Sequence, residues 1–458
     1  MAIRVSSKTP INREGATYRK LQSVTSRLAS KDFTLWGKEA EAESQIRLNW
    51  IDLPRTSQEL TPQLFELQQW MERNDLTNLI LCGMGGSSLG PEVLAKTFNK
   101  TLAVLDTTDP EQILAALPSS LEKSAILVGS KSGSTAETSS QKSFIEKTLR
   151  DQGLDPRNHF VIITDPGSPF DISSRSDGLL VINADPNVGG RFSVLSAFGI
   201  VPAAAMGCDY TSLLDDALSA SESFLEPASA AVDIAVAILE ANKQMLAFTD
   251  GGSNVPGLSD WIEQLIAEST GKDGKGYLPI AIENSRAPIS GDALLISFNS
   301  NDVHADLVVE GNIGEQFILW EWVTALLGIP LEINPFDQPN VTEAKVRALG
   351  LLDRWQNVIP EFTPAYESEN LQVFSSSSAT SLQGQLEDFF DMKSSYIAIM
   401  AYLARGVDDA ILPLRKLVAE QTNLPTSFGW GPRFLHSTGQ YHKGGIPNGA
   451  FMIITGDN

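Results

Sequence analysis

The stretch AILVGSKSGSTAET, residues 125–138, joins an apolar run to a polar loop and the start of a helix. The run from Ala125 to Gly129 is short, aliphatic and broken by glycine, which is typical of a buried strand. Free backbone N–H groups at a helix start, with hydroxyls and a lysine beside them, predict a seat for a phosphate dianion. The alternative is an ordinary Ser/Thr cap, but one cap uses a single hydroxyl. Five hydroxyl residues and one lysine are present: Ser130, Lys131, Ser132, Ser134, Thr135 and Thr138.

Other apolar runs alternate with helical patterns on both sides of this stretch. Strands that alternate with helices favour a doubly wound parallel sheet, with ligands bound beyond the carboxyl ends of the strands. The predicted fold class is therefore α/β, with two doubly wound parallel sheets and flanking helices. The expected strands lie near residues 78–82, 102–105, 125–129, 160–164 and 179–182, and then near 245–248, 278–282, 293–298, 306–309, 395–402 and 450–455.

Length and charge limit the class of protein. A chain of 458 residues exceeds one ordinary core, so we expect two domains, at residues 1–230 and 231–458, and a polar surface excursion at 357–384. A formal net charge of −22 opposes binding to nucleic acid or to an anionic membrane. Two distant cysteines, and no apolar run long enough to cross a bilayer, favour a cytoplasmic protein.

Two glycine-rich turns lie at predicted strand ends. The turn GMGGSSLGP at residues 83–91 lacks the G-x-G-x-x-G spacing of a dinucleotide site, so NAD binding is not expected. The pair Gly189-Gly190 precedes Arg191 at an expected helix start. Glycines allow close backbone approach, and the arginine can then reach an oxyanion. An exposed surface arginine is the alternative.

Three further residues are candidates for proton transfer. Glu268 is expected at the C-terminus of a helix, where the helix dipole raises a carboxyl pKa and suits it to act as a base. Lys345 ends the motif PFDQPNVTEAK, early in a helix where lysine is disfavoured unless it faces an anion. For both residues, a solvated surface position is the alternative. His436, in a glycine-rich segment, is the best candidate among four histidines for a proton carrier near neutral pH. A metal site is not expected, because His436 and His442 lack carboxylate or thiolate partners at a suitable spacing.

Taken in order, these motifs resemble the glucose-6-phosphate isomerase (phosphoglucose isomerase) family, whose members have two sugar-isomerase (SIS) domains. The resemblance covers most of the chain from Leu79 to Lys345. The family's histidine motif normally falls between its glutamate and proline motifs, whereas here the good match, His436-Ser437, follows Lys345. That permuted order resembles the isomerase half of fused transaldolase–phosphoglucose isomerases.

The resemblance implies reversible conversion of glucose 6-phosphate to fructose 6-phosphate without a metal or redox cofactor. It implies that Glu268 transfers a proton between C2 and C1 through a cis-enediol, and that Arg191 stabilises the enediolate. His436 and Lys345 would open the sugar ring, and Gln338 would position the substrate. It also implies a homodimer in which a histidine from one subunit completes the other's site. The implied substrate-binding residues are Gly86, Ser87, Ser130, Lys131, Ser132, Thr135 and Gln338.

Two alternatives stay open at this point. One is an isomerase for a related sugar phosphate, such as mannose 6-phosphate. The other is a sugar-phosphate sensor that keeps the phosphate loop without chemistry, although a sensor has no use for Glu268, Arg191, Lys345 and His436 together.

Overall fold

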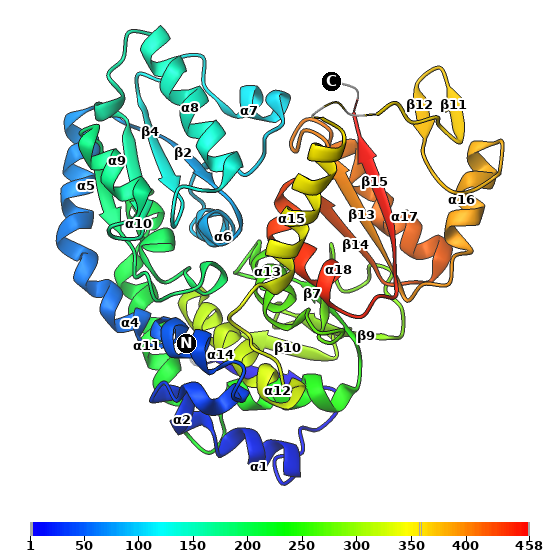
Figure 1. Ribbon diagram of the computed structural model, residues 1–458. Helices are drawn as coiled ribbons and strands as arrows, with labels where there is room; N and C mark the ends of the chain where they lie inside the picture. The colour runs from blue at the N-terminus through cyan, green and yellow to red at the C-terminus, as the bar shows by residue number, and fades with distance from the viewer. Residues whose placement is uncertain (1–2, 357, 359, 457–458) are drawn as a thin grey trace.

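The first sheet is parallel and has the order β3-β2-β4-β5-β6 in the computed structural model, which describes residues 3–356, 358 and 360–456 (Figure 1). Alternate residues of its central strand face opposite layers, as expected for a strand buried on both faces. Ile126 and Val128 belong to one buried cluster with Ile145 of α8, whereas Leu127 belongs to a separate buried cluster that also contains Leu64 of α5. The strands are β2 (Asn78–Gly83), β3 (Ala103–Leu105), β4 (Ser124–Gly129), β5 (Phe160–Thr164) and β6 (Leu180–Asn183), and the helices are α5 (Thr61–Arg73), α6 (Leu89–Thr97), α7 (Pro110–Ala116), α8 (Ala136–Asp151), α9 (Pro169–Ser176) and α10 (Ala197–Ala205).

The strand order places the two predicted ligand turns side by side. From β2 the chain goes first to β3 on one side and then to β4 on the other, so the order reverses between β2 and β4. Gly83 at the end of β2 pairs with Gly129 at the end of β4. In open α/β sheets, ligands bind in the crevice beyond the carboxyl ends of the strands at this reversal. The glycine-rich turn of residues 83–91 and the predicted phosphate-binding loop of residues 130–138, called the phosphate loop below, both begin there.

The second sheet has the order β1-β10-β9-β7-β8, and β1 is its one antiparallel strand. A separate parallel sheet has the order β14-β13-β15. The α/β class with parallel sheets is thus confirmed, while β1 and β14 were not predicted. The bounds are β1 (Arg4–Ser7), β7 (Met245–Thr249), β8 (Leu278–Ala281), β9 (Ala293–Ser297), β10 (Leu307–Glu310), β13 (Tyr396–Tyr402), β14 (Thr426–Trp430) and β15 (Gly449–Thr455).

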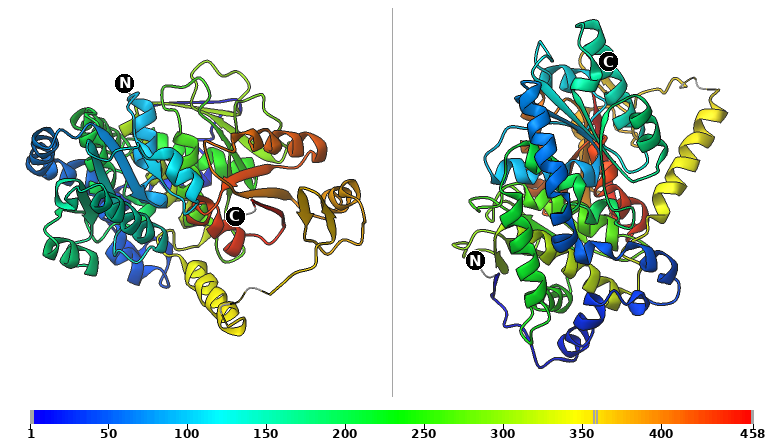
Figure 2. Two further views of the ribbon diagram at one scale, coloured as in Figure 1. Left: turned by 90° about the horizontal axis from the view of Figure 1, so that it is seen from above. Right: turned by 90° about the vertical axis from the view of Figure 1, so that its left-hand side faces the viewer.

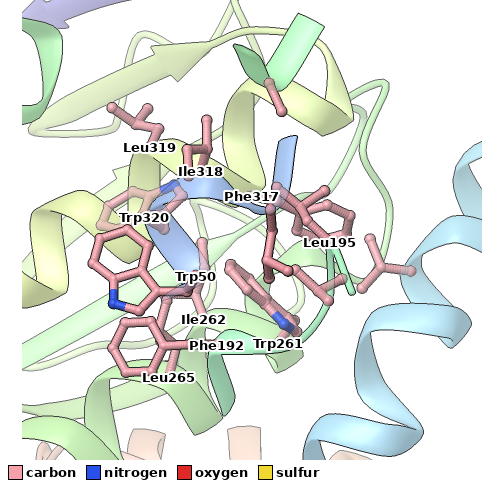
Figure 3. Packing of buried hydrophobic residues seen from close by; sticks show 14 of the residues in the cluster. Trp50, Phe192, Leu195, Trp261, Ile262, Leu265, Phe317, Ile318, Leu319 and Trp320 are labelled. Carbon is pink, nitrogen blue, oxygen red and sulfur yellow. The ribbon is translucent and has the colours of Figure 1, made fainter. Parts of the chain in front are cut away.

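One continuous core joins the two halves of the chain. The helix α14 (Ile313–Leu331) is buried along nearly its whole length, and its aromatic residues contact α13 (Leu258–Thr270). Trp261 lies 4.9 Å from Phe317 between ring centroids, and Trp50 lies 5.3 Å from Phe192. Figure 3 shows these rings gathered from several elements. The N-terminal segment and the turn that carries Arg191 are therefore packed into the same core as the second half.

The remaining helices surround these layers. The predicted domain boundary at 230/231 stays a prediction, and β1 from the first predicted domain lies in the sheet of the second. No helix within the described ranges is long and apolar enough to span a bilayer. The remaining helices, which surround the layers, are α1 (Ala16–Gln22), α2 (Thr25–Ala29), α3 (Glu41–Arg47), α4 (Leu53–Thr56), α11 (Tyr210–Ser223), α12 (Ala230–Ala241), α15 (Pro339–Arg354), α16 (Leu382–Phe390), α17 (Pro413–Thr422) and α18 (Gly439–Gly444).

The predicted polar excursion contains regular structure. Strands β11 (Tyr366–Ser368) and β12 (Leu371–Val373) form a small antiparallel hairpin there. Residues 357 and 359, at the start of that stretch, lie outside the described residues. Just before it, α15 projects from the body of the molecule in both views of Figure 2, where it is coloured yellow.

Candidate active site

The turn after β2 lies close to three later segments of the chain, because two of its residues are glycines without side chains. Gly85 has a φ of +54°, and a Cβ there would lie 2.6 Å from Nε2 of Gln264 and 3.0 Å from the carbonyl oxygen of His436. A Cβ on Gly86 would lie only 1.9 Å from the carbonyl oxygen of Gly190. The two glycines thus bring α13, the Arg191 turn and the His436 segment together at the first sheet's reversal point.

Glu268 is the buried carboxylate of this site. It lies in the last turn of α13, as predicted, and is 6% exposed. Its Oε2 accepts a hydrogen bond from Nε2 of Gln338 at 2.8 Å and lies 3.6 Å from Arg191 Nη1, while Oε1 accepts a longer bond from Gln264 at 3.4 Å. Burial raises the pKa of Glu268, and Arg191 opposes that rise. Burial is therefore the main cause of its perturbed acidity, and the contribution of the helix dipole stays a prediction.

Arg191 connects three segments beneath that carboxylate. It lies in a 3-10 turn (Gly190–Phe192) rather than at the expected helix start, and is 2% exposed. Its Nε donates to Oγ of Ser269 at 2.7 Å, and its Nη2 donates to the carbonyl oxygens of Pro335 and Asp337. Lys272 fixes the same loop, because its Nζ donates to Oδ1 of Asp337 at 2.6 Å. Burial lowers the pKa of Lys272 to about 8.

His436 reaches the site from its own chain. It ends the 3-10 turn η8 (Arg433–His436), and its Nε2 lies 3.3 Å from Oε1 of Glu137 in the first turn of α8. The hydrogen bond with His436 lowers the pKa of Glu137, and the nearby charge of Lys345 adds to that effect. Lys345 itself is exposed on α15. This contact is within one chain, and the contribution of a histidine from a partner subunit stays a prediction.

His442 has a different role from His436. Burial lowers its pKa to about 3, and its ring stacks on Tyr396 with centroids 5.7 Å apart. A histidine that is neutral throughout the physiological range does not exchange protons there. Of these two histidines, His436 is the one placed to carry a proton.

The predicted phosphate seat lies at the start of α8. Ser130 is buried, and its Oγ accepts a hydrogen bond from the backbone N–H of Gly133 at 3.1 Å. Gly133 has a φ of +75°, so the loop turns back at a conformation that favours glycine. Ser132 is exposed, and Thr135 takes the N-cap position of the 16-residue helix. Helix N-termini present unpaired N–H groups and attract anions.

Lys131 is directed away from that helix start. Its Nζ donates to Oδ1 of Asp165 at 3.0 Å and to the carbonyl oxygen of Val188 at 2.9 Å. These contacts join the phosphate loop to the loops that follow β5 and β6. Ser87 is half-buried in the β2 turn, beside the Gly86 contact described above. The binding roles of these residues stay predictions.

Sequence reasoning missed three residues that hold the catalytic candidates. Glu137 contacts His436, Gln264 contacts Glu268, and Asp337 contacts Lys272. Glu137 and Asp337 each lie within a motif singled out above. Gln264 could have been found by spacing, because it precedes Glu268 by four positions on one helix and so shares its face.

The chain is similar to known sugar-phosphate isomerases. Residues 66–272 match the phosphoglucose isomerase family. A glucose-6-phosphate isomerase of Thermus thermophilus is 35% identical over 235 residues, which are 49% of this chain and 56% of that protein. A solved hypothetical protein, also of Thermus thermophilus, is 27% identical, with a TM-score of 0.64 over 76% of this chain and 99% of that one. A solved glucose-6-phosphate isomerase of Chlamydia trachomatis has the same fold, with 17% identity and a TM-score of 0.60 over 79% of this chain and 90% of that one.

The match to known relatives is partial in length. The chain spans about half the length of the curated relatives it matches first. The family match includes the phosphate loop, Arg191 and Glu268 and ends at Lys272, before Gln338, Lys345 and His436. The order of motifs within that range and the shared fold agree with the resemblance noted in the sequence. Residues 66–272 of the chain are therefore similar to the phosphoglucose isomerase family, and the chain shares the fold of a solved glucose-6-phosphate isomerase.

Proposed function

We propose that this protein is an aldose–ketose isomerase that interconverts glucose 6-phosphate and fructose 6-phosphate. The observation that carries the proposal is the buried Glu268 carboxylate, held between Arg191 and two glutamine amides at the reversal point of the first sheet. Isomerisation of an aldose to a ketose removes a proton beside a carbonyl and returns it to the neighbouring carbon. One carboxylate can perform both transfers through a cis-enediolate.

Glu268 has the properties of such a base. Its pKa is raised by burial, which brings it closer to neutral pH, where a general base is most effective. The Gln338 amide holds Oε2 and leaves the carboxylate in one orientation. A placed general base accelerates proton transfer by about 10²–10⁴-fold.

Arg191 is the candidate for charge stabilisation. Its guanidinium is buried, stays protonated in proteins, and places Nη1 3.6 Å from Glu268. Fixed donors in a water-poor site stabilise a developing oxyanion by about 3–4 kcal/mol. An enediolate formed beside Glu268 would have this cation beside it.

Ring opening is assigned to His436 and Lys345. The Glu137 carboxylate lies 3.3 Å from His436 Nε2 and would orient the imidazole for transfer between the ring oxygen and the C1 hydroxyl. The exposed Lys345 would approach the same side of the substrate. Ser130, Lys131, Ser132 and Thr135 would hold the phosphate, while Gly86 and Ser87 would line the sugar.

Conversion of glucose 6-phosphate in deuterated water, followed by NMR, tests this proposal. The wild-type protein should form fructose 6-phosphate and incorporate solvent deuterium at C1, the carbon that receives the transferred proton. Glu268→Gln should lower the rate by about 10²-fold or more while a sugar-phosphate inhibitor still binds in calorimetry. Glu321→Gln is the matched control, because Glu321 is also a buried carboxyl whose pKa burial raises, but it lies on α14 and is not among the residues that contact Glu268.

The proposed activity has two clear alternative outcomes. Ligand binding without turnover by the wild-type protein would indicate a sugar-phosphate sensor. Faster turnover of mannose 6-phosphate than of glucose 6-phosphate would reassign the substrate. A homodimer remains a prediction for ultracentrifugation.

A further inference from the structure

The loop between α14 and α15, residues 332–338, brings an exposed amide to the buried base. Nε2 of Gln338, the last residue of this loop, donates to Oε2 of Glu268 at 2.8 Å. The helix that follows gives little support to this amide, because no side chain that the structure describes in α15 is buried. Figure 2 shows α15 projecting from the body of the molecule. The position of Gln338 therefore depends on what holds the loop.

Two buried cations hold the loop from beneath. Nζ of Lys272 donates to the carbonyl oxygen of Asn334 at 2.6 Å, to that of Asp337 at 2.8 Å, and to Oδ1 of Asp337 at 2.6 Å. Nη2 of Arg191 donates to the carbonyl oxygens of Pro335 and Asp337. The lysine is 1% exposed and the arginine 2%. The carbonyl oxygen of Asp337, directly before Gln338, thus accepts a hydrogen bond from each cation.

The two cations divide their hydrogen bonds differently. Arg191 is shared, because its Nε donates to Ser269 and its Nη1 lies 3.6 Å from Glu268. Lys272 has three N–H donors, and its three acceptors all belong to the loop. A lysine is almost never this deeply buried unless it is paired, and a displaced loop would leave its charge uncompensated. The lysine therefore disfavours other positions of the loop.

The same end of α13 supplies both the base and the anchor of its partner. Glu268 lies in the last turn of α13, and Lys272 follows it by four residues. The connection between them is closely packed, since a Cβ on Gly271 would lie only 2.5 Å from Cα of Tyr441. A short, fixed segment thus sets the distance from the carboxylate to the ammonium group, and through the loop to Gln338.

We propose that Lys272 is a positioning residue for the general base: its ammonium group holds residues 334–337 so that the Gln338 amide meets the Glu268 carboxylate. Within the described ranges, Lys272 donates no hydrogen bond to Glu268, so its hydrogen bonds act on the base through the loop. The inference rests on the proposed function, in which Glu268 transfers the proton.

A test must separate this role from the charge of the lysine. Burial raises the pKa of Glu268, whereas the charges of Arg191, His436 and Lys272 lower it. Lys443 also faces Glu268, and that carboxylate raises the pKa of the Lys443 ammonium group. Loss of Lys272 therefore raises the pKa of Glu268 even if the loop stays in place. The part of the effect that passes through the amide is what identifies positioning.

The pH–rate profile measures that part, because its position does not depend on how much of the protein is folded. In Lys272→Met the acidic limb of kcat/KM should move to higher pH, since both the lost charge and the displaced Gln338 donor raise the pKa of Glu268. The same change made in Gln338→Leu should give a smaller move, because only the charge effect remains. Equal moves in the two backgrounds would overturn the positioning role.

The rate constants give a second comparison in the same four proteins. We expect kcat to fall by about tenfold in Lys272→Met, as for loss of one hydrogen bond to a charged group. In Gln338→Leu the further loss should be less than about twofold, since the amide is already absent. A general loss of folded protein would instead multiply the two effects, and full multiplication would contradict the proposal.

Lys275→Met is the matched control for removal of a lysine in this region. Lys275 lies three residues beyond Lys272, is exposed, and donates from Nζ to the carbonyl oxygen of Leu331 at 2.9 Å, just before the loop begins. This variant loses the same charge and the same kind of bond, but leaves the contacts of Asp337 intact. It should keep the wild-type kcat and acidic limb. Changes as large as those in Lys272→Met would refute a specific role for Lys272.

Asp337→Ala gives the same comparison if Lys272→Met yields too little folded protein. Its side chain is 39% exposed, so the change removes one acceptor of Lys272 without opening the core. We expect kcat to fall by about threefold or more, and to fall no further when the change is added to Gln338→Leu. An equal loss in both backgrounds would count against the proposal.

Crystal structures of the variants separate this inference from the proposed activity, because they need no turnover. The distance from Nε2 of Gln338 to Oε2 of Glu268, 2.8 Å in the wild type, should exceed about 3.5 Å in Lys272→Met and stay unchanged in Lys275→Met. If the wild-type protein showed no turnover but this dependence held, the proposed function would fail while the positioning role stood. An intact bond in Lys272→Met would disprove the positioning role, whatever the activity.

Discussion

Gln338 donates a hydrogen bond from Nε2 to the carboxylate of Glu268 at 2.8 Å. Gln338 is exposed at the N-cap of α15, whereas Glu268 is buried at the end of α13. The bond stabilises the charged form of a carboxyl group whose pKa burial would otherwise raise further. We therefore expect an exposed residue to adjust the acidity of the buried base.

Gln338→Leu should move the acidic limb of the pH–rate profile to higher pH. Activity falls as pH drops through the pKa of Glu268, because the protonated acid is no longer a base, and loss of the amide donor raises that pKa further. We also expect kcat to fall by about tenfold, as for one hydrogen bond to a charged group. Plots of kcat/KM against pH measure both. Gln264→Leu removes a hydrogen bond that also lowers the pKa of Glu268, so it should displace the acidic limb in the same direction. A displacement to lower pH would contradict this account.

Lys131→Met should weaken substrate binding more than catalysis. The lysine lies in the phosphate loop and is held by Asp165, so its loss removes both a positive charge and a loop anchor. We expect KM for the sugar phosphate to rise by about tenfold or more, with kcat changed much less. Asp165→Asn keeps the positive charge and should raise KM less. A fall in kcat at unchanged KM would show that Lys131 has another role.

Gly86→Ala should disturb the Arg191 turn through steric contact alone. The added Cβ would lie 1.9 Å from the carbonyl oxygen of Gly190 and 3.1 Å from the backbone nitrogen of Arg191. Since both atoms belong to the backbone, the turn must move, and kcat should fall by about 10²-fold. Calorimetry should show a lower Tm. Gly190→Ala, whose Cβ would have no neighbour within 4 Å, should keep the wild-type Tm.

Glu321→Met should stabilise the protein at neutral pH. Glu321 is fully buried in α14, and burial raises its pKa well above the usual value. Above about pH 4.5 the unfolded chain ionises this group while the folded protein keeps it protonated, so wild-type stability falls as pH rises. The free energy of unfolding should therefore increase by about 1 kcal/mol or more in the variant at pH 7. Urea unfolding should show this gain at pH 7 and lose it near pH 4, and a gain that grew on acidification would contradict the explanation.

The strands of the parallel sheets could be predicted because both of their faces are buried. A run such as Phe160–Thr164 is apolar throughout and ends at a turn, so its sequence alone marks it. Strand β1 has no such signal, since Arg4–Ser7 alternates exposed and half-buried residues at a sheet edge. Strand β14 contains Gly429, and the sequence around it favoured a loop.

The single motifs of the candidate site could be predicted from the sequence, but the contacts between their residues could not. Glu268 and Arg191 could be named from their local sequences, because helix ends and glycine turns have local signatures. The contact between His436 and Glu137 joins positions 299 residues apart and depends on the packing of the third sheet against α6. No local pattern encodes such a distance.

Strand β1 covers an edge of the second sheet that would otherwise be open. Val5 pairs with Val309 on the outer edge of β10, so β1 covers the last open strand of a sheet built from residues beyond 240. A fragment that began at residue 231 would expose the unpaired backbone groups at the outer edge of β10 to solvent. Unpaired edge strands can form hydrogen bonds with strands of other molecules and so cause aggregation. If the chain is divided into two halves, we therefore expect the second half to be soluble only when the first is co-expressed, because β1 of the first half then pairs with β10 of the second.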